Sequence, residues 1–178
     1  MRIGIMLGAT PDPEASLDKF IATARSVEEK GFASLWLAHI RGHDAVIAMG
    51  LAGQATDSIE VGTAVTPLQP RHPMALAQAA LTAQALAKGR LTLGIGLSHK
   101  VVIEGMLGLS YTAPAKTTED YLEVLLPLLA GESARIRNST YSVDIALDVP
   151  DAKKPVPVAL AALGPRLLAL AGRYTAGT

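Results

Sequence analysis

The segment Leu91–Lys100, LTLGIGLSHK, contains a Gly94-x-Gly96 pair of the kind that begins a dinucleotide-binding loop, followed by a serine and a histidine. A dinucleotide-binding loop carries a third glycine three residues after the second, which lets its helix pack close to the preceding strand. His99 occupies that position here, with Ser98 before it. The Gly94-x-Gly96 pair is therefore only a weak sign of dinucleotide binding.

The segment LGPR at 163–166 is a second candidate for chemistry, because it opens an apolar helical pattern. Free backbone N–H groups and the positive end of a helix dipole can hold a phosphate, and glycine permits close approach. Proline has no N–H, so the donors would be Leu163, Gly164 and Arg166. The alternative interpretation is an ordinary helix start.

Histidine and cysteine usage limits the other chemistries. The four histidines are scattered without a His-x-x-x-His pair, so we expect no metal site. The absence of cysteine excludes thiolates and disulfides, and no G-x-S-x-G elbow supports a serine triad. His39 follows a short apolar run, where its imidazole could hydrogen-bond a ligand or donate a proton, or bond to neighbouring loops.

Composition indicates an α/β protein. Hydrophobic residues make up 49% of the 178 residues but aromatic ones only 4%, so the core must consist of Ala, Leu, Val and Ile, as in helices packed on a parallel sheet. Sixteen basic residues balance sixteen acidic ones, which disfavours nucleic acid and anionic membranes as partners. Without a signal peptide or an 18-residue apolar segment, we expect a soluble cytoplasmic protein.

Short apolar runs alternate with helical patterns along the chain. Strands are expected at 2–7, 33–38, 59–65, 91–96 and 155–161, the first of them buried on both faces. Helices are expected from an Asp12 cap and Pro13 to Gly31, and then over about 43–56, 73–88, 118–130 and from 164 onward. The interval 97–117 resembles a loop, and 134–143 predicts a small hairpin outside the main sheet. Arg71 and His72 are expected to anchor and cap the loop before the third helix.

Five alternating units predict right-handed crossovers and a parallel sheet. A doubly wound sheet and part of a (β/α)8 barrel both fit this pattern. Polar and glycine residues fall just after the expected strand ends, at Gly8, His39, 63–66, 96–99 and 162–164. In a barrel these positions would converge on one mouth, where such enzymes place their active sites.

Three sequence blocks occur in a specific order: SLWLAH at 34–39, VGTAVTPLQPRHPMALAQAALTAQALAKGRLTLGIGLSHK at 61–100, and VALAALGPRLLALAGRYTAGT at 158–178. The middle block is the most specific, with G-T-x-V, R-H-P, a helix and G-R-x-x-L-G-x-G. Together they resemble the luciferase-like monooxygenase superfamily and, within it, the oxidoreductases that depend on the deazaflavin coenzyme F420. The resemblance implies an α/β fold of the (β/α)8 TIM-barrel type, of which residues 1–178 form one partial domain of about five units with a hairpin insertion.

The resemblance also implies which residues face the cofactor ring. His39 would be the polar partner of the ring or of the substrate, although the family's usual Asp-His pair is here Ala38 and His39. Thr63, Ala64 and Val65 would support the ring, at the place where F420-dependent relatives have a non-proline cis peptide between residues 64 and 65. An ordinary strand end is the alternative.

The other wall of the implied site follows the fourth strand. Gly96 would leave room for the flat ring, with Ser98 beside it, and His99 is a second candidate for catalysis. Both Ser98 and His99 could instead hold the rim of the mouth. The LGPR segment at 163–166 would bind the cofactor phosphate.

The implied reaction is hydride transfer between coenzyme F420 and a small organic substrate. One alternative keeps the fold and uses FMN for a monooxygenase reaction. Another is a non-catalytic cofactor-binding or interaction protein made of a truncated barrel. Five units would leave two open strand edges, so we expect a longer protein, with RYTAGT at 173–178 near the start of a sixth strand, or a homo-oligomer that pairs these edges.

Overall fold

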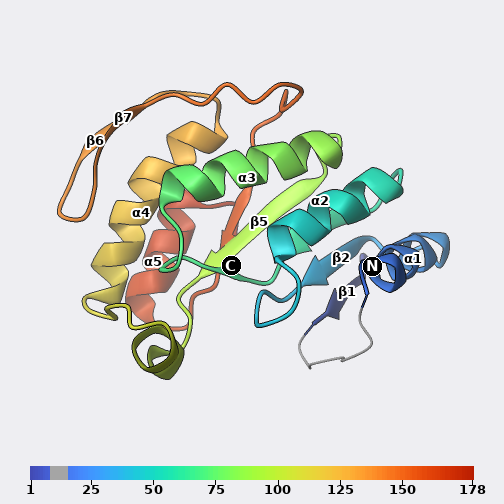
Figure 1. The fold of residues 1–178 in the computed structure, drawn as a ribbon, viewed down its shortest axis with the longest axis horizontal. Coiled ribbons are helices and arrows are strands. Elements are labelled where there is room, and N and C mark those ends of the chain that lie inside the picture. The colour runs from blue at the N-terminus through green and yellow to red at the C-terminus, as the bar shows by residue number, and fades with distance from the viewer. Residues whose placement is uncertain (9–15) are drawn as a thin grey trace.

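The main sheet is parallel, and its strands pair in the order of the chain apart from one two-residue strand. Figure 1 shows the course of the chain through the sheet and its helices. A computed structural model describes residues 1–8 and 16–178. Strands β1 (Gly4–Leu7), β2 (Ser34–Leu37), β3 (Glu60–Thr63), β5 (Leu91–Gly96) and β8 (Val158–Leu160) pair in that order, and β4 (Thr66–Pro67) pairs with the end of β5. The four expected crossovers between parallel neighbours are therefore present.

In the described residues, five α-helices follow one another around the sheet. They are α1 (Leu17–Glu29), α2 (Ala45–Ala55), α3 (Pro73–Leu86), α4 (Pro114–Leu129) and α5 (Pro165–Tyr174). Each packs against the next, α1 on α2, α2 on α3, α3 on α4 and α4 on α5. A doubly wound sheet reverses its strand order and divides its helices between two faces. The observed order shows consecutive units of a partial barrel, as predicted.

The core is built from small aliphatic residues, which lets the helices approach closely. A methyl group at Gly53 of α2 would lie 2.4 Å from the Cβ atom of Ala87, and one at Gly50 would lie 3.2 Å from the Cβ atom of Ala83. Ala45, Ala48 and Ala52 of α2 are fully buried. This close packing explains how a chain with so few aromatic residues fills its interior.

The first unit differs from the prediction in two respects. The residues of β1 are half-buried or exposed rather than buried on both faces, and the Met6 side chain is 54% exposed. The reason is that β1 pairs only with β2 in the described chain. Helix α1 begins at Leu17, where the Ser16 side chain accepts a hydrogen bond from the Lys19 N–H. The predicted Asp12 cap and Pro13 lie outside the described residues.

The segment after β5 also differs from the expected loop. Residues Val101–Met106 form a π-helix, η1, and α4 begins at Pro114, one turn earlier than predicted. The predicted hairpin is confirmed as β6 (Ala134–Arg137) and β7 (Ser142–Ile145), which pair antiparallel outside the main sheet. Near the end of the chain, Gly177 forms a parallel bridge with Ala159, where RYTAGT is predicted to begin a further strand.

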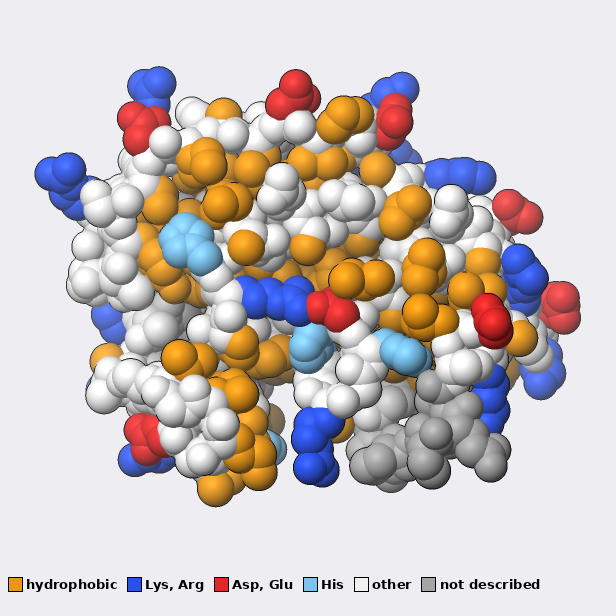
Figure 2. All heavy atoms as spheres, viewed as in Figure 1, with side chains coloured by type: hydrophobic (Ala, Val, Ile, Leu, Met, Phe, Trp, Pro, Cys, Tyr) orange, Lys and Arg blue, Asp and Glu red, His pale blue; other side chains and the backbone are white. Residues whose placement is uncertain are grey.

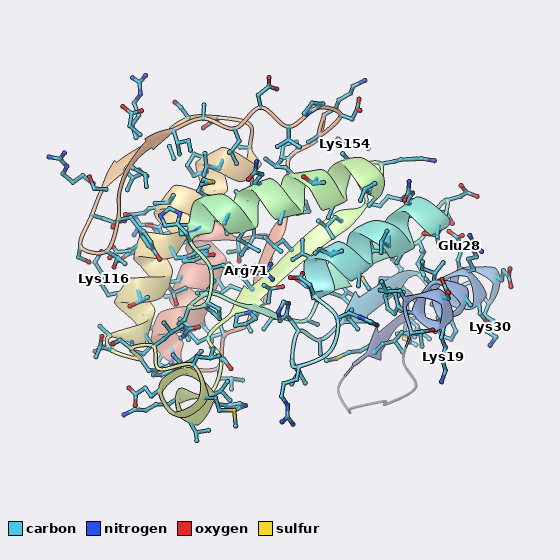
Figure 3. All side chains as sticks on the ribbon, viewed as in Figure 1. Lys19, Glu28, Lys30, Arg71, Lys116 and Lys154 are labelled. Carbon is cyan, nitrogen blue, oxygen red and sulfur yellow. The ribbon has the colours of Figure 1, made fainter. Side chains whose placement is uncertain are left out.

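Two charged side chains hold the loops at the N-terminal ends of the strands. Arg90 donates to the carbonyl oxygens of Gly53 and Ile59, both at 2.6 Å. The Glu28 carboxylate accepts backbone N–H groups from residues 57, 58 and 59, the shortest at 2.6 Å from Ser58 (Figure 3). Burial opposes ionisation of Glu28, but these hydrogen bonds lower its pKa to about 2.

Strand β5 approaches the end of β3 too closely for a side chain at Gly94. The Thr63 hydroxyl donates to the Gly94 carbonyl at 2.6 Å, and a Cβ atom on Gly94 would lie 1.8 Å from the Thr63 carbonyl oxygen. The β3–β5 ladder pairs only Val61 with Leu91 and Gly62 with Thr92. The Thr63 bond therefore continues the contact between the two strands beyond their ladder.

Replacing Gly94 should destabilise the fold. We expect Gly94→Ala to lower the free energy of unfolding by about 1–3 kcal/mol, because the new methyl group must displace the Thr63 carbonyl. Gly172→Ala is the matched control, since Gly172 lies in α5 with open space around it and should gain up to about 1 kcal/mol. Urea unfolding followed by circular dichroism measures both, and equal effects would contradict the close approach.

The Glu28 hydrogen bonds should make stability depend on pH in acid. Because the folded-state pKa of about 2 lies below the ordinary value of 4.5, the contribution of Glu28 is complete above 4.5 and disappears as the pH falls toward 2. Urea unfolding across this window should show a weaker pH dependence in Glu28→Gln than in the unmodified chain. Glu29→Gln, at the exposed neighbouring position, is the control and should retain the full dependence.

Candidate functional site

The predicted site residues lie at the C-terminal ends of neighbouring strands, which together form one edge of the sheet. The register pairs Leu37 with Thr63, Pro67 with Gly96 and Ile95 with Leu160, so these strands end side by side. The segments after them begin at residues 38, 64, 97 and 161. In a parallel barrel this edge is where ligands and substrates bind.

The bulge after β3 lies against the end of β5. The peptide bond between Ala64 and Val65 is cis, at the position where the resemblance placed it. The Ala64 N–H donates to the Leu37 carbonyl at 2.9 Å, which joins this bulge to β2. Val65 is half-buried, and the methyl groups of its side chain face the two glycines of β5.

The space beside Gly96 is already filled by protein. A Cβ atom there would lie 2.9 Å from the Cβ atom of Ala161 and 3.0 Å from Cγ2 of Val65. The glycine therefore lets Val65 and Ala161 close over β5 rather than leaving room for a flat ring. The surface that Val65 and Ala161 present at this edge is then available to a ligand.

His39 is half-buried directly after β2 and is held by the start of α2. Its Nδ1 atom accepts a hydrogen bond from the Ala45 N–H at 3.3 Å, which places the ring proton of the neutral imidazole on Nε2. Burial lowers the pKa of His39 below its ordinary value, and the nearby Arg71 acts in the same direction while Asp44 opposes it. His39 is therefore suited to donate a hydrogen bond from Nε2 as a neutral ring.

An ion pair next to His39 is the part of the site that the sequence did not reveal. Asp44 caps α2 by accepting the N–H groups of Val46 and Ile47, and its other carboxylate oxygen pairs with Arg71. Figure 3 shows Arg71 beside the first turn of α2. On this face, hydrophobic side chains surround an abutting basic and acidic pair, while most other charges lie toward the rim (Figure 2).

The predicted role of the Arg71–His72 cluster is confirmed. His72 caps α3, because its Nδ1 accepts the Met74 N–H at 3.2 Å, and Arg71 anchors the loop through Asp44. The two residues that form this ion pair are 27 positions apart in the sequence. No motif of either segment predicts that contact.

Ser98 and His99 lie on the path from β5 to η1. Ser98 is half-buried and His99 is exposed, and the His99 carbonyl accepts the N–H groups of Val102 and Ile103 at 2.9 and 3.0 Å. Within residues 1–8 and 16–178, no hydrogen bond links His99 with His39, so the structure does not join the two candidate catalytic histidines by such a contact. Their catalytic and binding roles stay predictions.

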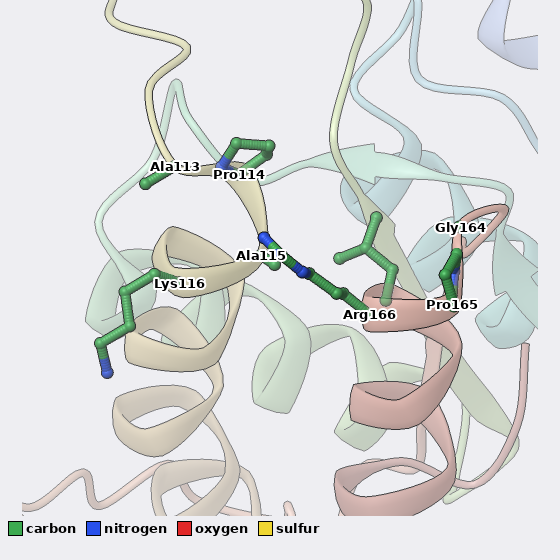
Figure 4. A pocket seen from close by; sticks show the side chains of 8 residues that line it. Ala113, Pro114, Ala115, Lys116, Gly164, Pro165 and Arg166 are labelled. Carbon is green, nitrogen blue, oxygen red and sulfur yellow. The ribbon is translucent and has the colours of Figure 1, made fainter.

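A cavity of about 430 Å³ lies between the first turns of α4 and α5 (Figure 4). The Leu168 N–H makes a helical bond to the Gly164 carbonyl, so the N–H groups of Arg166 and Leu167 precede the first intrahelical partner. The Arg166 side chain extends from α5 toward Ala115 of α4, whereas Lys116 points away from it. Leu163 is almost fully exposed. The lining comprises Ala113, Pro114, Ala115, Lys116, Gly164, Pro165, Arg166 and Leu167.

The cavity residues fit an anionic ligand. Two helix N-termini direct the positive ends of their dipoles toward the same space, and the Arg166 guanidinium adds a full charge. Both helices have proline in the first turn, and neither has a side-chain cap among the residues described. A phosphate with an attached apolar chain matches this combination of donors and alanine and proline walls.

The chain is similar to known proteins along its length. The family model of the luciferase-like monooxygenases matches residues 1–178. The F420-dependent glucose-6-phosphate dehydrogenase of Beutenbergia cavernae is 36% identical over 165 residues, which cover 84% of this chain and 48% of that protein. The limonene 1,2-monooxygenase of Rhodococcus erythropolis is 27% identical, with 95% of this chain and 46% of that protein covered.

A solved structure shows the same fold. The coenzyme F420 dependent tetrahydromethanopterin reductase from Methanopyrus kandleri superposes with a TM-score of 0.81 and 23% identity, over 98% of this chain and 54% of that one. The chain thus spans about half the length of the relatives it matches. Within the described part of the chain, no helix combines the length and the apolar character needed to cross a membrane.

Proposed function

The chain belongs to the luciferase-like monooxygenase family, and we propose that it contributes the cofactor-binding half of an oxidoreductase that uses coenzyme F420 on a small organic substrate. The observation that carries this proposal is the cavity between the first turns of α4 and α5, which lies beyond the same strand ends as His39 and the Val65 bulge. The name of the Beutenbergia cavernae relative supports F420 as the cofactor.

The α5 end of the cavity would hold the cofactor phosphate. The N–H groups of Gly164, Arg166 and Leu167 and the Arg166 guanidinium supply the donors, and Ala115 and Pro114 supply apolar contacts. Leu163, which is almost fully exposed, would donate only its backbone N–H. With these donors the chain would hold an anion without a lysine-rich or glycine-rich phosphate loop.

The ring end of the cofactor would lie against the bulge after β3. Val65 and Ala64 offer an apolar surface there, and Gly96 allows that surface to pack on β5. When bound, the deazaflavin supplies a carbon that accepts or donates a hydride. His39 would donate a hydrogen bond from Nε2 to the ring or the substrate, and its lowered pKa keeps it neutral at physiological pH.

Ser98 and His99 would complete the wall on the β5 side. His99 is exposed and can reach a substrate in solution, so it is the second candidate for proton transfer. The substrate itself would contact η1 and the loop that follows it, which carry the exposed Val101, Met106 and Leu107.

A second candidate function uses FMN in a monooxygenase reaction at the same site. The limonene 1,2-monooxygenase relative favours it, because that protein matches 95% of the chain. FMN also carries a phosphate and a flat ring, so the described residues suit both cofactors. A binding measurement with each cofactor distinguishes them.

Cofactor titration of the purified chain tests the proposal. We expect coenzyme F420 to bind, with a change in its absorbance and fluorescence, and Arg166→Gln to weaken binding about tenfold, because a charge-assisted hydrogen bond to phosphate is lost. Arg173→Gln at the other end of α5 is the matched control and should bind as the unmodified chain does.

Three results of the titration would contradict parts of this proposal. Tight binding of FMN with no response to coenzyme F420 would replace the first proposal with the second. Failure to bind either cofactor, in a chain that unfolds cooperatively, would favour a non-catalytic interaction protein. Equal weakening by both arginine variants would show that α5 does not hold the phosphate.

A further inference from the structure

We infer that Arg71 is a positioning residue for His39: by pairing with Asp44 it holds the start of α2, so that the Ala45 N–H meets Nδ1 and the ring proton stays on Nε2. The inference rests on the proposed function only for its purpose, which is to present His39 as a hydrogen-bond donor at the strand ends. The contacts that carry it belong to the chain alone.

Three hydrogen-bonded steps connect the two residues. Arg71 Nη2 pairs with Asp44 Oδ2. Asp44 Oδ1 accepts the N–H groups of Val46 at 2.9 Å and Ile47 at 3.2 Å, which orients the first turn of α2. The Ala45 N–H in that turn donates to His39 Nδ1 at 3.3 Å. If Arg71 is removed, the Asp44 carboxylate, which organises this turn, therefore loses its ion-pair partner.

The Arg71–Asp44 ion pair is partly shielded from water. The side chains of Arg71 and Asp44 are 26% and 23% exposed, so water screens their attraction less than it screens a fully exposed ion pair. By contrast, Arg135 and Asp144 on the hairpin each retain 78%. Exposed pairs of that kind contribute little, which makes the hairpin pair a suitable reference.

Two charges act on His39 in opposite directions. Asp44, from the N-terminus of α2, favours the protonated imidazole, and Arg71, from the loop before α3, disfavours it. With Arg71 present the carboxylate is directed toward the guanidinium, so the neutral ring is favoured. These charge effects act through space, whereas the position of the Ala45 N–H acts on the tautomer of the ring, so the tautomer is the readout that reports positioning.

The test follows the His39 imidazole by NMR, through two-bond ¹H–¹⁵N spectra of the cofactor-free chain over a pH series. The signals are assigned with His39→Gln. We expect the unmodified ring to show the Nε2–H tautomer, and Arg71→Met to show a smaller fraction of it, because the Ala45 N–H is no longer held at Nδ1. In Arg71→Met the titration midpoint of His39 should move to higher pH, and in Asp44→Asn, which retains a helix cap, it should move to lower pH.

Rescue and control variants complete the experiment. Arg71→Lys should return the midpoint toward that of the unmodified chain, and Arg135→Met on the hairpin should leave it unchanged. The inference is overturned if Arg71→Met keeps the Nε2–H fraction of the unmodified chain, or if Arg71→Met and Asp44→Asn shift the midpoint in the same direction or not at all. If Arg71→Met does not fold, the comparison of Asp44→Asn with Arg71→Lys decides, because only the former should lower the midpoint.

The outcome is independent of cofactor binding. Opposite midpoint shifts, together with a smaller Nε2–H fraction in Arg71→Met, in a chain that binds neither coenzyme F420 nor FMN would support the positioning role and reject the proposed function. Cofactor binding without these shifts would do the reverse.

Discussion

The close approach of β5 to the end of β3 is the constraint on which the candidate site depends. Gly94 has no side chain, so the Thr63 carbonyl can occupy the space where a Cβ atom would lie, and the Thr63 hydroxyl bonds to the Gly94 carbonyl. That contact brings the Ala64–Val65 bulge over β5, where Gly96 accommodates Val65 and Ala161. The edge that carries the candidate site is shaped by backbone packing before any polar side chain acts on it.

Small residues have the same effect in the helical layer. Gly50 and Gly53 of α2 allow α3 to approach within contact distance, and the alanines of both helices fill the interior without large rings. Short distances between α2 and α3 also bring the loop before α3 to the start of α2. The Arg71–Asp44 pair forms in that place, so the charge arrangement around His39 is a product of tight helix packing.

Much of this architecture could be predicted from the sequence, because local patterns encode it. The apolar runs predicted each strand of the main sheet apart from the two-residue β4, and proline after His72 marked the start of α3. The resemblance located the cis peptide. The sequence did not predict the features that depend on contacts between distant segments. Nothing in VVIEGM at 101–106 distinguishes a π-helix from a loop, and nothing near Asp44 indicates a partner 27 residues away.

The bonds of Glu28 and Arg90 lie at the opposite ends of the strands from His39. They join α1 and α2 to the loop before β3 through backbone groups, which every residue type except proline would offer at positions 57–59. The segments after β2, β5 and β8 begin at the other ends of these strands. A protein engineer could therefore exchange the segments after β2, β5 and β8 to recruit a different ligand, while the far end keeps the strands in register.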